Sequence, residues 1–535
     1  MSAIATPENV LLVSVDQLSA KWLEEPHSAI IPTPTLDRLR AAGTTFTNAY
    51  TSNPLCAPAR ATLATGLTTR QHGVLMNGYR LRPDLPTFMH RLRDAGWRTG
   101  GFGKFHFTPQ FVESHPAYES YGFDECRITE DQRLGEWLDW IRSEHPWHFN
   151  TALATIPNID LPALRSYGPH DEDLLHQVVT AKRAIDWDTR LDWEEQEAPN
   201  PAAYALPFPE ELSQTNWITD HAVSFVENAT SGWCAHVSYV QPHPPNTPPQ
   251  RFLDRVDTDA ITDPIEPTWP DDPDRPACFD RGDPKRHTEL DNPNGYERRR
   301  YYFADIAHLD AQLGRLLDAV DLEETSVIFL SDHGELLFDH GFSGKGQKHY
   351  DASIRIPLVI AGAGVQRGAV IDHFVQLEDV CPTILDLADV TPEPRETLQD
   401  RLEPLPAGYP DRSIGSVEDL PEHFPGRSLR PLLAGEPPTD WRESAYVESF
   451  NNIYSANPAH WARTIRTERY RYTRYPAHGG EQLFDLSCDA EERTNLAADP
   501  EHEAVRGRLR DRLLDRMILQ DHPITPRDLV AFGMP

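Results

Sequence analysis

The chain has 535 residues, a hydrophobic fraction of 39% and a formal net charge of -33 at pH 7, and its mean hydropathy is -0.55. Such an acidic chain argues against nucleic acid, anionic membranes and highly sulfated polymers as easy partners, because each would be repelled at long range. The charge is equally explained by solubility alone. No stretch approaches the ~18 apolar residues of a membrane span, and the N-terminus has no basic start followed by an apolar run. We therefore expect a cytoplasmic protein that does not bind membranes.

The first part of the chain alternates predicted strands and helices. Residues 9–16, NVLLVSVD, form an apolar, β-branched run that ends in a carboxylate, which predicts a buried parallel strand with Asp16 at its C-terminal edge. Ligands bind at that edge in open α/β sheets. Helices are predicted at about 35–42, directly after Cys56 and at about 85–95, and a glycine-rich strand and loop is predicted at 97–106.

The middle of the chain is less regular. Residues 113–215 are rich in Trp, His and acidic side chains, and we interpret them as an insertion near the mouth of the site, with no residue assigned a role. Further strands are predicted at 233–240, 326–332 and 355–362, and helices at about 295–320 and 376–388. Between them, 244–295 is rich in proline and aspartate and predicts a long surface excursion.

The chain changes character after a proline-rich linker and residue 435. Alternating segments at 444–450, 461–466 and 470–475 predict a small antiparallel sheet, followed by a helix at about 501–518 and a tail. We therefore expect a catalytic α/β domain at 1–435, which includes the insertion, and a smaller C-terminal subdomain at 436–535.

The six cysteines have no paired spacing for zinc or for disulfides, so we expect reduced thiols: Cys56, Cys126, Cys234, Cys278, Cys381 and Cys488. Only six of the 50 Lys and Arg residues are lysine. An acid-rich, lysine-poor composition is typical of salt-adapted proteins, but a GC-rich genome gives the same skew, and both explanations stay open.

Cys56 has an unusual chemical context. It lies between two prolines at a turn, just ahead of a predicted helix N-terminus, in the sequence NPLCAPARATLATG. Free N–H groups and the helix dipole stabilise anions at such a position. The pattern Cys56-x-Pro-x-Arg60 resembles the signature of the type I sulfatases, and the resemblance extends from Asn9 to about Leu496.

The resemblance implies that a formylglycine-generating enzyme oxidises Cys56 to an aldehyde whose hydrate is the nucleophile, with Arg60 steadying that hydrate. It also implies an alkaline phosphatase-like fold, with a mixed, mostly parallel sheet between helices and a smaller C-terminal subdomain on a four-stranded antiparallel sheet. One divalent cation is implied, usually Ca²⁺, with Mg²⁺ or Mn²⁺ as alternatives. Its ligands would be Asp16, Gln17, Cys56, Asp332 and His333. Gln17 replaces the usual second aspartate, and resembles the choline-sulfatase-like and phosphonate monoester hydrolase-like branches.

Four further residues match motifs that contact the substrate in the family. Gly103-Lys104-Phe-His106 matches the Gly-Lys-x-His element, and His243 matches the later histidine. Lys345 and Lys348 compete for the last lysine, because the spacing departs by one residue; we favour Lys345, since Gly-Lys-Gly keeps the local pattern. Lys348 and the loop residue Asn77 remain candidate substrate-binding residues.

The mechanism that we expect uses Lys104, Lys345 and His243 to neutralise the nonbridging oxygens of the ester. His243 or Lys345 would protonate the departing alkoxide, Asp332 would take the proton of the nucleophile, and His106 would take the proton whose loss releases sulfate. The substrate would be a small sulfated molecule and the protein a possible homo-oligomer. Two alternatives remain, a phosphonate monoester or phosphodiester hydrolase with the same nucleophile, which Gln17 favours, and a catalytically silent metal-binding protein.

Overall fold

The computed structural model of the chain describes residues 6–185, 187, 201–272, 275–276, 278–279, 293–390, 425–450, 460–476 and 479–520. Its main sheet has eight strands in the order β5-β4-β6-β1-β7-β8-β2-β9. The strands are β1 (Asn9–Val15), β2 (Gly43–Phe46), β4 (Arg98–Gly103), β5 (Glu125–Ile128), β6 (Trp233–Ser238), β7 (Thr325–Ser331), β8 (Leu358–Ala361) and β9 (Ala369–Ile371). The first five in this order are mutually parallel, and β8 is antiparallel to both its neighbours.

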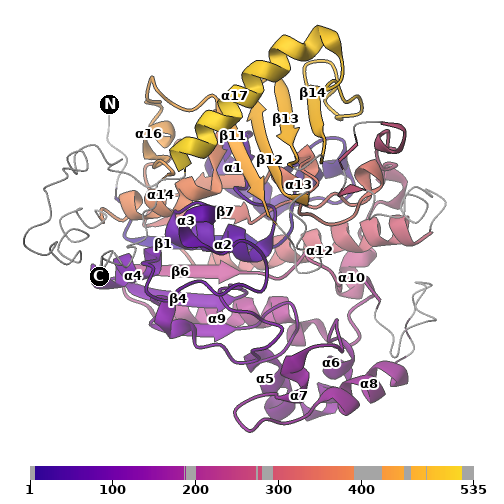
Figure 1. Cartoon of the computed structure of the whole chain (residues 1–535). Helices are drawn as coiled ribbons and strands as arrows, with labels where there is room; N and C mark the ends of the chain where they lie inside the picture. The colour runs from indigo at the N-terminus through magenta and orange to yellow at the C-terminus, as the bar shows by residue number, and fades with distance from the viewer. Residues whose placement is uncertain are drawn as a thin grey trace, which may run out of the picture.

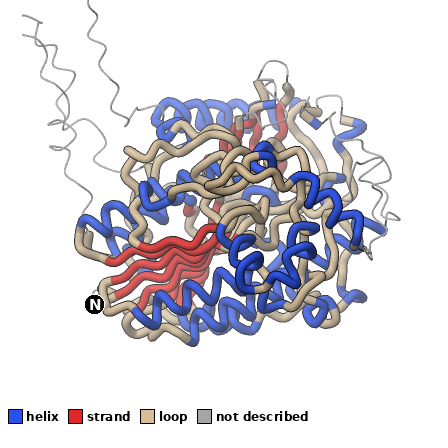
Figure 2. Tube along the Cα trace, turned by 90° about the horizontal axis from the view of Figure 1, so that it is seen from below, coloured by secondary structure: helices blue, strands red, loops and turns tan. Residues whose placement is uncertain are grey.

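Helices cover both faces of this sheet, as Figures 1 and 2 show. Every residue of β1 is buried, because its side chains alternate between two apolar layers. Val10 and Leu12 pack in the layer of α2 (Cys56–Thr65), α4 (Phe88–Asp94) and α14 (Val380–Leu387). Leu11 and Val13 pack in the layer of α1 (Pro34–Ala42), α9 (Gln214–Asn228) and α12 (Pro293–Asp318).

The irregular stretch 113–215 contains one strand of the main sheet. Its strand β5 pairs in parallel with β4 and is the edge of the sheet. Beyond it the chain forms the short helices α5 (Glu136–Glu144), α6 (Phe149–Ala154), α7 (Pro162–Arg165) and α8 (Leu175–Ala184), which Figure 1 shows together beside the sheet. The stretch therefore contains both a peripheral group of helices and an edge strand of the main sheet.

The remaining short elements connect the main ones. They are α3 (Thr69–His72), α10 (Gln250–Leu253), α13 (Asp351–Ile354), α16 (Arg430–Leu433), and the two-stranded sheet of β3 (Ala49–Tyr50) and β10 (Val375–Gln376). The 3-10 turns include η10 (Leu377–Asp379), which leads into α14.

A second sheet of four antiparallel strands lies in the C-terminal part, with α17 (Glu503–Gln520) along one face (Figure 1). Its strands are β11 (Ser444–Ser449), β12 (Ala462–Thr467), β13 (Tyr470–Arg474) and β14 (Glu481–Asp485). One row of paired residues crosses all four strands and packs against Leu509 and Leu513 of α17: Tyr446, Ile465, Tyr472 and Leu483. The cross-strand register thus gives the helix a continuous apolar surface.

The opposite face of this sheet joins the rest of the protein. Ala445 and Val447 form a buried cluster with Tyr50, Ile354 and Phe374. Such shared burial ties the small sheet to β3 and α13 rather than leaving it as a separate unit.

The structure confirms the predicted mixed α/β fold with a four-stranded antiparallel C-terminal sheet. The three alternating segments predicted for this sheet correspond to β11, β12 and β13, and the fourth strand, β14, lies beyond them. Among the described residues, no disulfide joins any of the cysteines. The proline-rich linker before residue 424, the tail after 520 and residues 280–292 of the expected excursion lie outside the described residues. The domain boundary at 435/436 stays a prediction.

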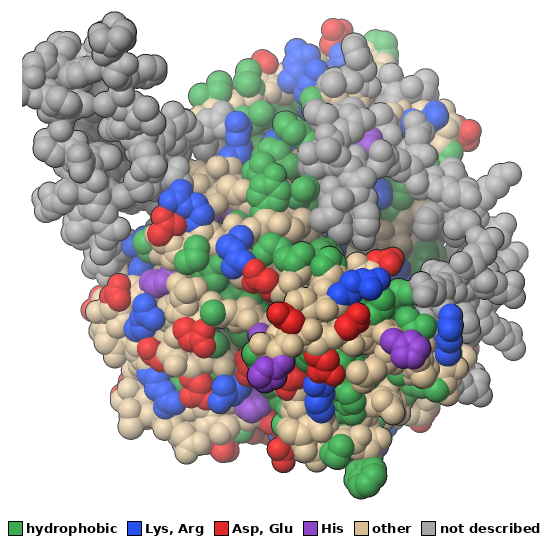
Figure 3. Space-filling model, turned by 60° about the horizontal axis from the view of Figure 1, so that its bottom comes forward, with side chains coloured by type: hydrophobic (Ala, Val, Ile, Leu, Met, Phe, Trp, Pro, Cys, Tyr) green, Lys and Arg blue, Asp and Glu red, His purple; other side chains and the backbone are tan. Residues whose placement is uncertain are grey.

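Charged groups are mixed on the surface. On the face shown in Figure 3, acidic and basic side chains are interspersed rather than gathered by sign. Among the described residues, no helix combines the length and the apolar character that a bilayer crossing requires.

A buried ion pair joins the two parts and can be tested. The side chains of Arg442 and Asp379 are only 8% and 0% exposed, and Arg442 Nη2 lies 2.7 Å from Asp379 Oδ1. Arg442→Met leaves the carboxylate buried without this partner, so we expect a loss of about 3 kcal/mol in unfolding free energy by urea titration. The control is Arg427→Met, whose ion pair with Asp440 is exposed and should cost less than about 1 kcal/mol. Equal losses would contradict a stabilising role for the buried pair.

Candidate active site

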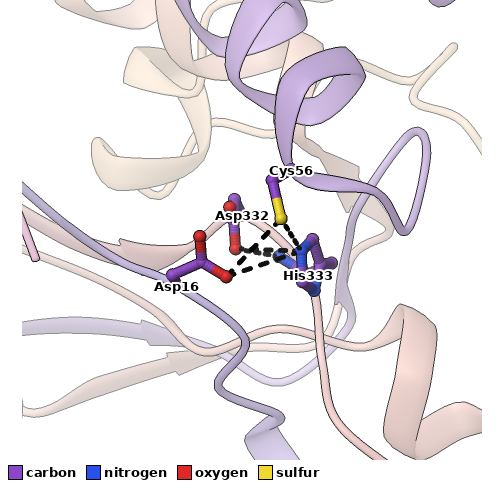
Figure 4. A group of neighbouring side chains, drawn as sticks. All are labelled: Asp16, Cys56, Asp332 and His333. Atoms are coloured by element: carbon purple, nitrogen blue, oxygen red, sulfur yellow. Dashed lines mark hydrogen bonds and ion pairs between the residues drawn. The ribbon is translucent and has the colours of Figure 1, made fainter. Parts of the chain in front are cut away.

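Five neighbouring parallel strands deliver polar side chains at one edge of the main sheet, where ligands bind in folds of this type. The side chains that follow the strands are Asp16 and Gln17 after β1, Asp332 and His333 after β7, Lys104 and His106 after β4, His243 after β6, and Glu130 and Asp131 after β5. Cys56 is the first residue of α2 and faces Asp16, Asp332 and His333 (Figure 4).

Cys56 is fully buried and surrounded by cationic and acidic groups. Its Sγ lies 3.0 Å from Lys345 Nζ, 3.3 Å from His333 Nε2 and 3.8 Å from Asp16 Oδ1. Burial raises the pKa of the thiol, but its neighbours outweigh burial and hold the pKa well below its usual value. The neighbours that lower it are Lys104, Lys345, His333 and His106. The environment at position 56 therefore stabilises negative charge.

Four of the predicted metal ligands form one buried cluster: Asp16, Cys56, Asp332 and His333. Their candidate ligand atoms all lie within 4.8 Å of one another, which suits a shared cation, since ligands ~2.4 Å from Ca²⁺ on opposite sides are about 4.8 Å apart. Burial and the neighbouring Asp16 raise the pKa of Asp332. A cation between the two carboxylates would relieve this repulsion, so the residues present fit a divalent metal.

Gln17 is oriented toward the same cluster. Its Nε2 donates to the Glu335 carboxylate, which can only accept, so its Oε1 faces Lys345 Nζ and accepts from it. The ammonium of Lys345 also lies 3.8 Å from Asp16 Oδ1. The acceptor atoms predicted to hold a metal thus already gather around a positive charge.

The backbone of Gln17 has φ 70°, a left-handed conformation that non-glycine residues rarely adopt. Such strain persists only where the surrounding structure enforces it, and it is concentrated at functional sites. His106 shares this feature, with φ 54°.

Arg60 links the two carboxylates of the cluster. Its Nη2 lies 3.1 Å from Asp16 Oδ2 and its Nε 2.9 Å from Asp332 Oδ2. Its Nη1 donates to the Lys104 carbonyl oxygen at 2.5 Å and to Ser238 Oγ at 2.7 Å. Arg60 therefore joins the ends of β1, β7, β4 and β6 in one hydrogen-bonded network and does not point at Cys56 alone.

Lys104 is completely buried between two carboxylates. Its Nζ forms ion pairs with Asp16 and with Asp131. Asp131 Oδ2 also accepts from Gln110 Nε2 at 2.8 Å and lies 4.0 Å from His243 Nε2. Burial raises the pKa of Asp131, but Lys104 and His243 hold it well below its usual value.

The two predicted histidines take different positions. Neither ring nitrogen of the buried His106 makes a well-formed hydrogen bond to a described residue. Its backbone is held by the Glu130 carboxylate, which accepts from the His106 N–H at 3.0 Å. His243 Nδ1 donates to the Pro244 carbonyl oxygen at 2.6 Å, so its Nε2 faces Asp131.

Lys345, Lys348 and Asn77 lie in different surroundings. Lys345 contacts Cys56, whereas Lys348 Nζ lies over the Phe342 ring, 4.8 Å from its centroid. Asn77 Oδ1 accepts from the Ala57 N–H at 3.0 Å, which caps the start of α2 beside the nucleophile.

The C-terminal sheet holds the loop that carries Lys345. Gln347 Nε2 donates to the Phe450 carbonyl oxygen at 3.1 Å, and the Tyr475 hydroxyl donates to the Gln347 carbonyl oxygen at 3.0 Å. His349 lies between Thr464 Oγ1 and Ser449 Oγ, at 2.8 and 3.0 Å. Although far from the nucleophile in sequence, β11–β13 thus fix this part of the site.

Sequence reasoning missed three acidic residues of the site. Glu130 and Asp131 follow a strand of only four residues inside a polar stretch, so the strand gave too weak a pattern. Glu335 was detectable in principle, because it follows Asp332-His333-Gly334 at the end of a predicted strand.

The comparisons with known proteins agree with this geometry. Residues 8–390 match the sulfatase family model, and residues 414–518 match the model described as N-sulphoglucosamine sulphohydrolase, C-terminal. The chain belongs to the sulfatase family. It is an enzyme of that class, a hydrolase of sulfate esters.

Relatives match over almost the whole chain. A choline-sulfatase of Rhizobium meliloti (strain 1021) is 27% identical over 92% of this chain and 83% of its own length. An arylsulfatase of Clostridium perfringens is 25% identical over 98% of both. The solved structure of the phosphonate monoester hydrolase SpPMH from Silicibacter pomeroyi has a TM-score of 0.71 at 24% identity, over 97% of this chain and 96% of that one, and shows the shared fold.

The metal cluster can be tested by stability. We expect Ca²⁺ at 100 times its Kd to raise the unfolding free energy of EDTA-treated protein by about 2.7 kcal/mol, because only the folded cluster binds it. Asp332→Asn should abolish this increment, whereas the exposed control Asp318→Asn should keep it. Urea titrations of each variant, with and without calcium, measure this gain in unfolding free energy. A calcium increment that survives Asp332→Asn would place the binding site elsewhere.

Proposed function

We propose that this sulfatase hydrolyses the sulfate monoester of a small alcohol, with the hydrate of a formylglycine at position 56 as nucleophile and a divalent cation, Ca²⁺ first, as cofactor. The observation that carries the proposal is the position of Cys56 at the start of α2, in contact with Lys345, His333 and Asp16. The cation would be held by Asp16, Gln17, Asp332, His333 and residue 56. When bound, it makes the hydroxyl of the hydrate more acidic and neutralises charge on the ester.

The residues around position 56 supply the electrostatic part of catalysis. Lys104 is a buried cation and Lys345 a partly buried one at the same edge of the sheet, and their positive charge favours the oxygens of a transferring sulfuryl group. Water is largely excluded there, so these charges act more strongly than in bulk solvent. Arg60 holds Asp16 and Asp332 in place while the ester reacts.

Proton transfers are assigned to side chains whose atoms face the site. Asp332 accepts the proton that the attacking hydroxyl loses, since its carboxylate belongs to the cluster beside residue 56. His106, whose ring lies beside the side chain of residue 56, takes the proton whose removal releases sulfate. His243 Nε2 or Lys345 Nζ protonates the departing alkoxide.

Gln17 supports one alternative, a phosphonate monoester or phosphodiester hydrolase with the same nucleophile. Gln17 puts a neutral amide where most of the family has a second aspartate, as the phosphonate monoester hydrolase-like branch does, and so lowers the negative charge near the cation. The silent metal-binding alternative is weakened, because the structure brings nucleophile, cations and carboxylates into contact.

A kinetic ratio tests the proposed reaction. On a preparation whose Cys56 peptide has the mass of formylglycine, we expect kcat/KM for an aryl sulfate to exceed that for an aryl phosphonate monoester. Cys56→Ala should lower both by about 10³-fold or more, because the covalent route is lost. A ratio well below one would favour the phosphorus ester, and full turnover by Cys56→Ala would refute the covalent mechanism for either ester.

The two competing lysines form a matched pair for mutation. Lys345→Met should lower kcat/KM for the aryl sulfate about 10²- to 10³-fold, since a charge beside the nucleophile is removed. Lys348→Met should change it by less than about threefold, because its ammonium lies against Phe342. Steady-state kinetics on both variants decide the assignment, and a larger effect at Lys348 would reverse it.

A further inference from the structure

The carboxylate of Asp131 lies against Lys104 and His243, the side chains proposed above to neutralise the oxygens of the ester, so its negative charge would oppose the binding of an anion there. Its residue is 5% exposed. It pairs with Lys104, accepts from Gln110 and lies 4.0 Å from His243 Nε2. Polar atoms of these three side chains surround the carboxylate, so the fold holds it in a fixed position.

Charges of both signs meet around residue 56. Three cations, Arg60, Lys104 and Lys345, lie against the carboxylates of Asp16, Asp131 and Asp332. The carboxylates of Glu130 and Glu335 lie at the same edge of the sheet, where they accept from the His106 backbone and from Gln17. Asp16 and Asp332 belong to the metal cluster, and Arg60 is shared between them. Asp131 lies outside that cluster and shares Lys104 with Asp16, so it further reduces the positive charge that Lys104 offers to the ester.

We propose that Asp131 is a specificity-determining residue that restricts the site to singly charged tetrahedral esters and disfavours doubly charged phosphate monoesters. This inference rests on the proposed function and adds the charge class of its substrate. A sulfate monoester and a phosphonate monoester each carry one negative charge. A phosphate monoester carries nearly two above its second pKa of about 6, and the second charge is repelled by Asp131.

The size of the effect follows from Coulomb's law. Two like charges about 6 Å apart at an effective dielectric constant of 20 to 40 repel enough to change a rate or binding constant about 10- to 100-fold. The repulsion acts on the extra charge of the phosphate monoester, so it distinguishes substrates by charge and not by the central atom.

The test compares three aryl esters with one leaving group at pH 8: a sulfate, a phenylphosphonate and a phosphate. Wild type should prefer the two singly charged esters to the phosphate. Asp131→Asn should raise kcat/KM for phosphate relative to sulfate about 10- to 100-fold. The ratio of kcat/KM for the phenylphosphonate to that for the sulfate should be the same in wild type and in Asp131→Asn. Asp131→Glu, which keeps the charge, is the matched control and should keep the wild-type preference.

Binding of the unreacted esters gives a second readout that needs no turnover. In a Cys56→Ala background, calorimetry at pH 8 with the aryl phosphate, which carries nearly two charges, and the aryl sulfate, which carries one, should show the same relative gain for the phosphate on Asp131→Asn. Asp131→Ser serves as a second neutral variant should the asparagine fail to fold.

Each contrary outcome is distinct. A wild-type preference for phosphate over sulfate, equal changes for all three esters, or an Asp131→Glu that behaves like Asp131→Asn would overturn the role of Asp131. A wild type that turns over the phenylphosphonate but no sulfate would defeat the proposed sulfatase reaction and leave the charge selectivity standing.

Discussion

The bridge from Arg60 to Asp16 and Asp332 is the interaction on which the site depends. The two carboxylates end adjacent central strands and are both fully buried. Charges at such depth are tolerated only when they are paired and hydrogen-bonded. Arg60 supplies the pairing from α2, the helix that also carries Cys56. The same guanidinium therefore stabilises the sheet edge and sets the position of the nucleophile above it.

The parts of the site that could be predicted lie where strong strand patterns end. β1 and β7 are seven-residue, fully buried apolar runs, so the acidic residues after them were recognisable as ligands. Lys104, His106 and Cys56 were found from short motifs, and the structure brings them together. Asp131 was not found, because a four-residue edge strand with alternating polar residues resembles a loop in sequence.

The choice between Lys345 and Lys348 shows a different limit. The two lysines lie three positions apart in one loop, and no local pattern states which one turns inward. Which lysine turns inward depends on the C-terminal sheet. Its hydrogen bonds to Gln347 and His349 fix the course of the loop and so the directions of Lys345 and Lys348. Contacts of that range, from residues a hundred positions away, carry no periodic signal along the chain.

The complete burial of Cys56 limits when its thiol can be modified. Pro58 and Arg60, the other residues of its motif, are buried with it in α2. An enzyme that oxidises this thiol must reach it, and the folded protein buries it completely. Under the proposed function, conversion competes with folding of the new chain. The active fraction of a preparation is then set during synthesis, and an unconverted molecule, once folded, stays silent.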